Sequence, residues 1–311
     1  VKGSATKCIE LHVYGEDAVP YFNKDYTDPT GSLSSSAYLL YSGSATSGDV
    51  QAEVDGKTYI FTLGTNAFKT IDEIFTKAGS NVPEIFVPYG TYGALNITKP
   101  CKIIGQNRRG SVYTSLDGAC MRGSAWLNGK SAKFSSVTVG CDGVTLKGLS
   151  FGGKLAYTKA MPVTIENCEF TDSSYIELAS GTSFVNLSGL GITSTAASFV
   201  TGALPATVNV QNCYFKNGSA FTNLTWGVDQ SSTACTLNVE FCRFDNIDSP
   251  VITDVRRGLA TDTSNIVMNV TNNVFGVKDS SKYAVSIKPA YYNNLILTGN
   301  TFVGTEDKGS P

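Results

Sequence analysis

Polar residues, charged in three cases and Asn223 or Thr225 in the fourth, recur at equivalent places in four short apolar segments of the C-terminal half of the chain. The segments are Tyr175–Leu178, Phe221–Trp226, Val251–Arg256 and Val285–Lys288. If their apolar residues face inward, strand alternation turns the charged ones outward, onto one face. This predicts a row of candidate catalytic residues, which are Glu177, Asp254, Arg256 and Lys288.

This row could support two kinds of sugar chemistry. In an elimination, Arg256 or Lys288 would remove the proton beside a uronate carboxylate, and Asp254 or Glu177 would hold a calcium ion that neutralises that carboxylate. In a hydrolysis, Glu177 and Asp254 would act as acid and as base or nucleophile. The alternative is a solvated surface on which opposite charges pair between strands.

Aromatic and amide residues close to these segments are candidates for substrate binding. Trp226, Tyr291 and Tyr292 could stack on sugar rings, and Asn223 could bind hydroxyls. The chain has a single histidine, His12, and no Cys-x-x-Cys pair, so a zinc site is not expected. Calcium is the one cofactor that the elimination would require.

A repeat explains how such a row would be positioned. Seven segments share the pattern apolar, polar, apolar, polar, Asn or Gly, Cys or Asn, any residue, Phe. They begin at Val144, Val163, Val185, Val208, Leu237, Met268 and Leu295, with spacings of 19 to 31 residues. The first four places predict a strand with one buried face, and the fifth predicts a turn with left-handed backbone angles. Cys168, Cys213 and Cys242 share the sixth place, which predicts one internal row of buried thiols rather than ligands or disulfides.

The repeat resembles that of the right-handed parallel β-helix superfamily, the pectate-lyase-like fold. Phe86–Tyr92, Leu95–Ile97 and Lys102–Gly105 are similar to its first coils. The resemblance implies an all-β solenoid whose outer sheets can carry a polysaccharide groove. The polygalacturonase, pectin methylesterase and pectate lyase motifs are absent from the sequence, so no enzyme family within the superfamily is matched.

Residues 66–311 are therefore predicted to form the β-helix, beginning with a short capping helix. Thr70 and Glu73 form a capping box, an apolar face follows, and Gly79 ends the run. In the superfamily such a helix covers the N-terminal end of the solenoid. Residues 1–65 lack the repeat and are predicted to be an extension packed on the solenoid, with a separate small domain as the alternative. A strand is expected at 8–14, and a hairpin at 51–62 that turns at Asp55-Gly56.

Composition limits the classes of partner. The net charge is −2 and only 16% of residues are charged, so no basic surface for nucleic acid is expected. The sequence contains no run of eighteen apolar residues, so no membrane-spanning helix is predicted. The chain begins at Val1 rather than Met, which suggests a mature or excised piece of a longer precursor.

Two functions are compatible with these features of the sequence. The preferred one is a secreted or cell-surface β-helix module, glycan-binding or adhesin-like and part of a larger protein. The alternative is a secreted polysaccharide lyase or glycoside hydrolase that acts in a groove on an outer sheet. In both, the expected partner is a polysaccharide or a cell-surface glycan.

Overall fold

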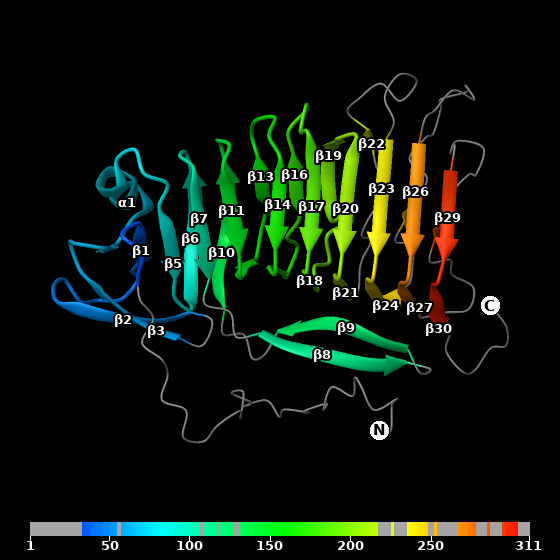
Figure 1. Cartoon of the computed structure of the whole chain (residues 1–311), viewed down its shortest axis with the longest axis horizontal. Coiled ribbons are helices and arrows are strands. Elements are labelled where there is room, and N and C mark those ends of the chain that lie inside the picture. Colours follow the sequence, from blue (N-terminus) through cyan, green and yellow to red (C-terminus); the bar gives the residue numbers. More distant parts are fainter. Residues whose placement is uncertain are drawn as a thin grey trace.

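The chain folds into long parallel β-sheets with one short helix in the part that the structure describes (Figure 1). A computed structural model describes residues 33–54, 57–105, 109–116, 119–126, 131–216, 225–226, 235–247, 252–253, 266–277, 285–286 and 294–303. The strands stack side by side along the long axis, as in a β-helix-like solenoid.

The largest continuous face is an eleven-stranded parallel sheet, which Figure 1 views from outside. Its order is β29-β26-β23-β20-β17-β14-β11-β7-β5-β1-β4, so from β5 onward each repeat adds one strand. The strands are β1 (Ala37–Leu40), β4 (Ala67–Phe68), β5 (Glu84–Val87), β7 (Cys101–Gly105), β11 (Val144–Lys147), β14 (Val163–Glu166), β17 (Phe184–Ser188), β20 (Thr207–Gln211), β23 (Cys235–Glu240), β26 (Ile266–Thr271) and β29 (Asn294–Thr298).

A thirteen-stranded sheet forms two further faces that meet at β10 (Ala132–Val139). The first half of β10 pairs with β12 and the second half with β13, while β6 (Gly90–Ile97) pairs along both halves. One branch contains β12 (Leu149–Phe151), β15 (Glu169–Phe170), β18 (Gly191–Ile192), β21 (Tyr214–Lys216), β24 (Arg243–Ile247), β27 (Val274–Val277) and β30 (Thr301–Val303). The other contains β13 (Leu155–Tyr157), β16 (Ile176–Leu178), β19 (Val200–Leu204) and β22 (Thr225–Trp226).

Three two-stranded sheets complete the strands described. The predicted hairpin is confirmed as β2 (Asp49–Val54) and β3 (Lys57–Thr62), which are antiparallel. A second antiparallel hairpin, β8 (Arg109–Leu116) with β9 (Ala119–Trp126), was not predicted. The third pair is parallel and contains β25 (Ile252–Thr253) and β28 (Val285–Ser286).

The fifth place of the repeat adopts left-handed backbone angles in all seven segments, as predicted. The residues are Gly148, Asn167, Gly189, Asn212, Phe241, Asn272 and Gly299, with φ between 53° and 66°. This turn lets the chain leave the eleven-stranded sheet and enter the next face at the same register in every coil. The repeat therefore fixes which side chains point inward and which point outward.

The eighth place forms an internal row of stacked aromatic rings. Phe215, Phe244 and Phe275 have ring centroids 4.7 and 5.0 Å apart, with nearly parallel planes. Ile192 interrupts the row, and Phe199 from a neighbouring part of the same coil fills the gap. Its ring makes edge contacts with Phe170 at 4.9 Å and with Phe215 at 5.7 Å. The aromatic contact is thus continuous although the repeat is not.

The sixth-place cysteines Cys168, Cys213 and Cys242 are buried and form no disulfide, and their thiols make hydrogen bonds. Each thiol lies between two backbone carbonyls, one in its own segment and one at the third place of the preceding segment, as Cys242 Sγ lies 3.3 Å from Glu240 O and 3.6 Å from Val210 O. Asn273 Nδ2 makes the equivalent bond to Val239 O at 2.9 Å. Cysteine and asparagine therefore share this place because both can donate inside the solenoid. Burial raises the pKa of the Cys242 thiol well above its ordinary value.

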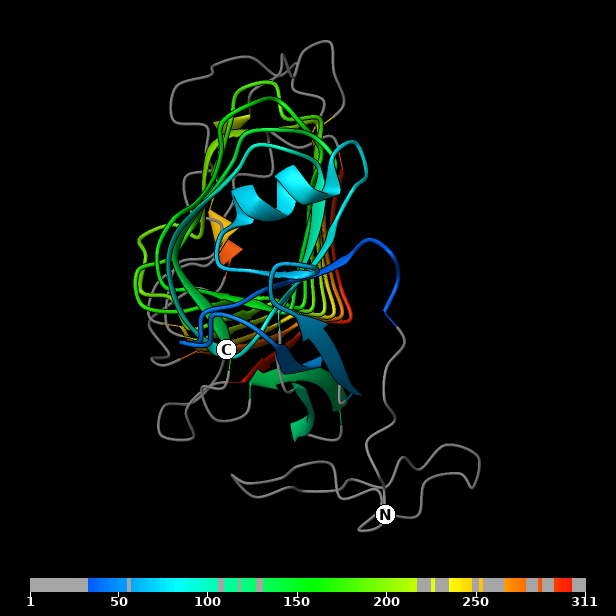
Figure 2. The same ribbon diagram turned by 90° about the vertical axis from the view of Figure 1, so that its left-hand side faces the viewer.

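Helix α1 (Ile71–Ala78) has the predicted capping box and buries the predicted apolar face, Ile71, Ile74, Phe75 and Ala78. These four side chains belong to the same hydrophobic core as the inward residues of the coils. Viewed along the stack, α1 lies across the opening at one end of the coils (Figure 2). Residues from before 66 also join the first sheet, since β1 lies between β4 and β5.

A double-mutant cycle tests the aromatic contact through Phe199. Phe199→Ala should lower the free energy of unfolding by about 3–5 kcal/mol because a buried ring is lost. Ile192→Phe alone should cost about 1–3 kcal/mol through overpacking. In the double variant the introduced ring restores the aromatic row. The loss of unfolding free energy in the double variant should therefore be smaller than the sum of the two single losses by at least about 1 kcal/mol. Urea unfolding of the four proteins measures this, and strict additivity would contradict the account.

Candidate functional site

Of the four residues in the predicted catalytic row, one, Glu177, lies in the described part of the chain. Glu177 lies on β16 between the buried Ile176 and Leu178, so its predicted outward direction is confirmed. Its Oε2 atom lies 2.7 Å from Lys154 Nζ, and both side chains are 44% exposed. Ala156 and Thr201 are its register partners on the flanking strands. Glu177 therefore takes part in an exposed ion pair between coils, the alternative that the sequence left open.

Trp226 is the one other predicted site residue in the described part of the chain, and its strand β22 belongs to the same branch of the sheet as Glu177. Asp254, Arg256, Lys288, Asn223, Tyr291 and Tyr292 lie outside the residues that the structure describes. Trp226 ends β22, at a register position beside the buried Leu204. Among the described residues, no group of His, Cys, Asp and Glu could hold a metal ion. The calcium site that Asp254 would complete remains a prediction.

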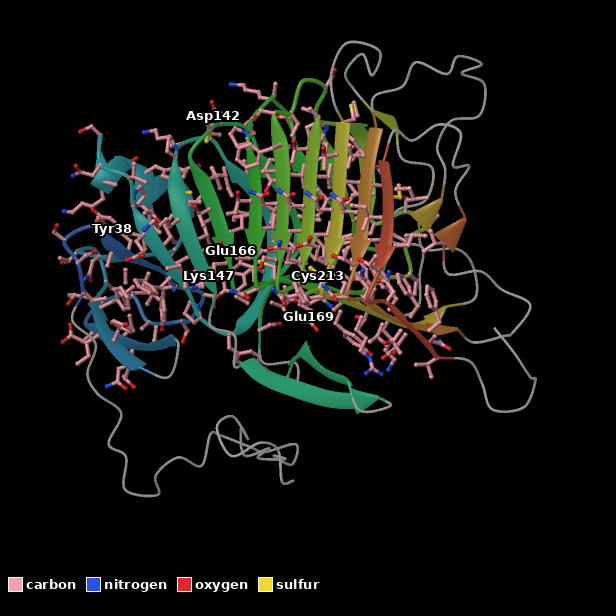
Figure 3. The ribbon with its side chains drawn as sticks, turned by 45° about the vertical axis from the view of Figure 1, so that its right-hand side comes forward. Tyr38, Asp142, Lys147, Glu166, Glu169 and Cys213 are labelled. Carbon is pink, nitrogen blue, oxygen red and sulfur yellow. The ribbon has the colours of Figure 1, made fainter. Side chains whose placement is uncertain are left out.

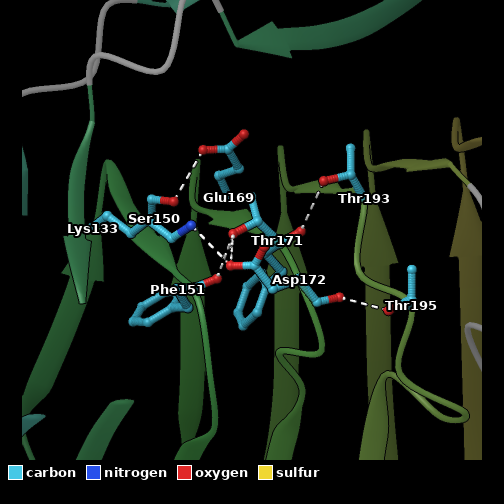
Figure 4. A network of polar contacts seen from close by, with 9 residues as sticks. Lys133, Ser150, Phe151, Glu169, Thr171, Asp172, Thr193 and Thr195 are labelled. Carbon is cyan, nitrogen blue, oxygen red and sulfur yellow. Dashed lines mark hydrogen bonds and ion pairs between the residues drawn. The ribbon is translucent and has the colours of Figure 1, made fainter. Parts of the chain in front are cut away.

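A second polar cluster lies on the outer face of the β12–β15 branch, and we call it the acidic cluster (Figure 4). It contains Lys133, Ser150, Glu169 and Asp172. Strand pairing places Lys133 beside Ser150 and Ser150 beside Glu169. Lys133 Nζ lies 2.9 Å from Asp172 Oδ2, and Ser150 Oγ donates to Glu169 Oε2 at 3.0 Å. Three successive coils thus contribute to one group.

The backbone around the acidic cluster is shaped to admit these contacts. A Cβ atom on Gly152 would lie 2.8 Å from Lys133 Cε and 3.2 Å from Asp172 Oδ2, so a side chain here would require the flexible end of Lys133 to shift. Asp172 has a left-handed φ of 55°, which aspartate tolerates better than most residues. Thr195 Oγ1 donates to its backbone carbonyl at 3.0 Å. The turn that carries Asp172 is thus held on both sides.

The two carboxylates of the acidic cluster have pKa values displaced in opposite directions. Burial raises the pKa of Glu169, and the hydrogen bond from Ser150 offsets this only in part. The hydrogen bond from Lys133 is the main cause of a lowered pKa at Asp172, which stays 63% exposed. A carboxyl group with a raised pKa beside an ionised carboxylate is the arrangement that acid–base chemistry on a glycosidic bond uses.

Further along the same outer row lies a second, partly buried group of Tyr214, Arg243 and Asp245. Arg243 Nε lies 2.8 Å from Asp245 Oδ2. Burial and the nearby Asp245 carboxylate raise the pKa of Tyr214 to about 12. Gly191, on the strand between Glu169 and Tyr214, has no side chain that could join the two groups. Strand β9 contacts β18 and β21 here, so the hairpin borders this part of the row.

The outer face of the eleven-stranded sheet carries a ladder of amides. Asn209 Nδ2 donates to Asn186 Oδ1, Asn238 to Asn209 and Asn269 to Asn238, each at 2.7 Å. These residues hold the second place of the repeat. Because β29 presents Ile296 at the next position, the ladder ends there. Within the described part of the chain, Asn269 Oδ1 is buried and accepts no hydrogen bond.

A second polar row runs beside this ladder at the fourth place of the repeat. Gln211 Nε2 donates to Glu240 Oε2 at 3.0 Å, and Thr271 Oγ1 donates to Glu240 Oε1 at 3.5 Å. Earlier coils continue the row with Lys147 and Glu166, both labelled in Figure 3. We call the two rows together the amide face. They present mainly uncharged donors and acceptors along the axis.

A cleft of about 360 Å³ lies beside the N-terminal end of α1. Tyr41 and Tyr92 are in its lining, and Lys69 Nζ lies 4.6 Å from the centre of the Tyr41 ring. The backbone N–H groups of Lys69 and Thr70 both donate to Glu73 Oε2. This carboxylate takes up the Lys69 and Thr70 donors, so the cleft offers the rings and hydroxyls of Tyr41 and Tyr92 beside the Lys69 ammonium.

Sequence reasoning missed the acidic cluster because it searched the strand after each Phe. The outer row lies instead at the seventh place, which the repeat leaves open to any residue. Read down the seven segments, that place holds Ser150, Glu169, Gly191, Tyr214, Arg243, Val274 and Thr301. The signal was therefore present, but it appears only once the column is read as a surface row.

The comparisons with known proteins found no match to a family model, a curated protein or a solved structure. In the described residues, no helix is long and apolar enough to cross a membrane.

Two substitutions in the acidic cluster should change stability with opposite pH dependence. Glu169→Gln should raise the unfolding midpoint at neutral pH, because the folded protein then avoids ionising a buried carboxyl. The gain should disappear below the ordinary glutamate pKa of 4.5, where the group is protonated in both states. Asp172→Asn should be destabilising at neutral pH, and that loss should shrink as the pH falls through the lowered pKa of Asp172. Thermal unfolding between about pH 3 and 7 measures both, and parallel pH profiles would contradict the assignment.

Extending the amide ladder by one residue tests its contribution to stability. Ile296→Asn places a donor beside the buried Asn269 Oδ1. Ile296→Asp introduces a side chain of the same shape as asparagine but places a second acceptor there. The asparagine variant should be more stable than the aspartate variant by about 1–3 kcal/mol, and at least as stable as the parent protein. Equal denaturant midpoints for the two variants would show that the ladder does not continue to β29.

Proposed function

We propose that the chain is a right-handed parallel β-helix of the pectate-lyase-like type, and that it binds a glycan outside the cytoplasm or at a cell surface. The parallel strand order and the repeat support the fold, since crossovers between parallel strands are right-handed in nearly all proteins. Helix α1 is its N-terminal cap, because an uncovered end would expose the core that Ile74 and Phe75 bury.

The observation that carries the proposed function is the amide face. Its side chains are spaced by one strand separation, about 4.8 Å, from β11 to β26. A polysaccharide extended along the axis would meet hydroxyls and amides in succession, together with the carboxylates of Glu166 and Glu240. Amide groups donate and accept at once, which suits sugar hydroxyls. Since the rows are mainly uncharged, the preferred glycan is neutral.

Glycoside hydrolysis is the second candidate function, and the acidic cluster is the observation that favours it. Glu169, with a raised pKa, would donate a proton to the leaving oxygen, and ionised Asp172 would act as base or nucleophile. The ion pair with Lys133 would have to open for this role. Binding without hydrolysis is preferred because the hairpin contacts β18 and β21 of this branch, whereas no described helix or strand lies over strands β11 to β29 in Figure 1.

Affinity electrophoresis on neutral and acidic polysaccharides tests the proposed function. The protein should be retarded by at least one neutral polysaccharide, and the double variant Gln211→Ala/Glu240→Ala should weaken that binding about tenfold or more. Glu177→Gln, on another face, should bind as the parent does. Retardation that the double variant leaves unchanged would exclude the amide face. New reducing ends that vanish in Glu169→Gln and Asp172→Asn would establish the hydrolase instead.

A further inference from the structure

One residue breaks the rule of the fifth place. Six of its seven members are glycine or asparagine, the residues that most readily adopt left-handed angles. The seventh is Phe241, with a φ of 53°. A bulky side chain at left-handed backbone angles is strained. Asparagine would relieve this strain, and the neighbouring coils have asparagine, Asn212 and Asn272, at the same place.

Burial in the core does not account for the phenylalanine. The Phe244 and Phe275 rings are fully buried in the internal row, whereas Phe241 is 49% exposed. Phe302 is also exposed, but its ring stacks on Phe275 at 5.1 Å as the last described member of that row. Phe241 therefore combines a strained backbone with an exposed ring. A strained residue kept without a packing reason suggests a functional role.

The place of Phe241 on the surface indicates what it would contact. It directly follows Glu240, whose carboxylate accepts hydrogen bonds from Gln211 and Thr271 on the amide face. Its own N–H donates to Thr271 O at 3.2 Å, so the turn is fixed to the next coil. Phe241 thus stands on the ridge where the eleven-stranded sheet ends, beside the part of the amide face richest in donors and acceptors.

Side chains on this ridge are directed along the stack. A Cβ atom on Gly299 would lie only 2.3 Å from Asn272 Oδ1, and one on Gly189 would lie 2.3 Å from Asn167 Oδ1. The asparagine of one coil therefore occupies the space above the glycine of the next. A ring at the fifth place stands among these amides in the direction that an axial glycan would follow.

We propose that Phe241 is an aromatic platform that stacks on a sugar ring of a neutral polysaccharide at the edge of the amide face; this inference rests on the proposed function. The apolar face of a pyranose packs on an aromatic ring, while its hydroxyls face the neighbouring amides and Glu240. The platform explains why this coil keeps a phenylalanine where its neighbours have asparagine.

The test replaces Phe241 with the residue that the repeat itself uses. Phe241→Asn should raise the melting temperature by about 2–4 °C, because the strain is relieved, and should weaken binding to the retarding polysaccharide at least tenfold. Phe241→Trp should retain that binding, because it keeps an aromatic face. Asn167→Gly, three coils away on the same ridge, is the matched control and should leave binding unchanged.

The outcomes separate the platform from the proposed function. If Phe241→Asn is stabilised and binds as tightly as the parent, the platform is excluded while glycan binding stands. If Phe241→Trp loses binding as completely as Phe241→Asn, stacking is likewise excluded. If the parent protein binds none of the polysaccharides, the proposed function and the platform are both overturned.

Discussion

The register between successive coils is the constraint on which the rest of this structure depends. A slip of one residue would turn every inward side chain outward, so each coil must start each strand at the same place. The left-handed turn at the fifth place provides this start, since Asn212 N donates to Glu240 O and Phe241 N to Thr271 O across the coils. Once that turn is fixed, the aromatic row, the buried thiols and the outer rows all follow from it.

Stacking of this kind makes interactions repeat along one axis, inside and outside. Each coil contacts mainly its neighbours, so a defect needs to be repaired only locally. The gap at Ile192 shows this, because Phe199 from the same coil restores the contact between Phe170 and Phe215. On the outside the same logic gives the amide ladder, which continues only as long as each coil supplies an asparagine.

Much of the fold could be predicted from the sequence because the features that determine it are local and repeated. Alternation predicted the strands, the capping box predicted α1, and the fifth place predicted the left-handed turns. The hairpin β8–β9 could not be predicted, because it interrupts the repeat and follows no period. Phe199 was missed for the same reason, since its role depends on a neighbour in space rather than on its place in the pattern.

The site was harder to predict because a surface row has no hydrophobic signal to mark it. Charges on one face need to match only their partners in the next coil, as Glu177 and Lys154 do, so chemically different residues share a column.

Binding an extended polymer and catalysing a reaction also require different arrangements of such columns. Binding needs similar groups repeated along the axis, as Asn186, Asn209 and Asn238 provide. Catalysis needs different groups to converge from several coils, as Lys133, Glu169 and Asp172 do. The regular coils of the solenoid supply the repeated groups that binding needs. The converging groups that catalysis needs occur only where a turn, such as that at Asp172, departs from the regular coil.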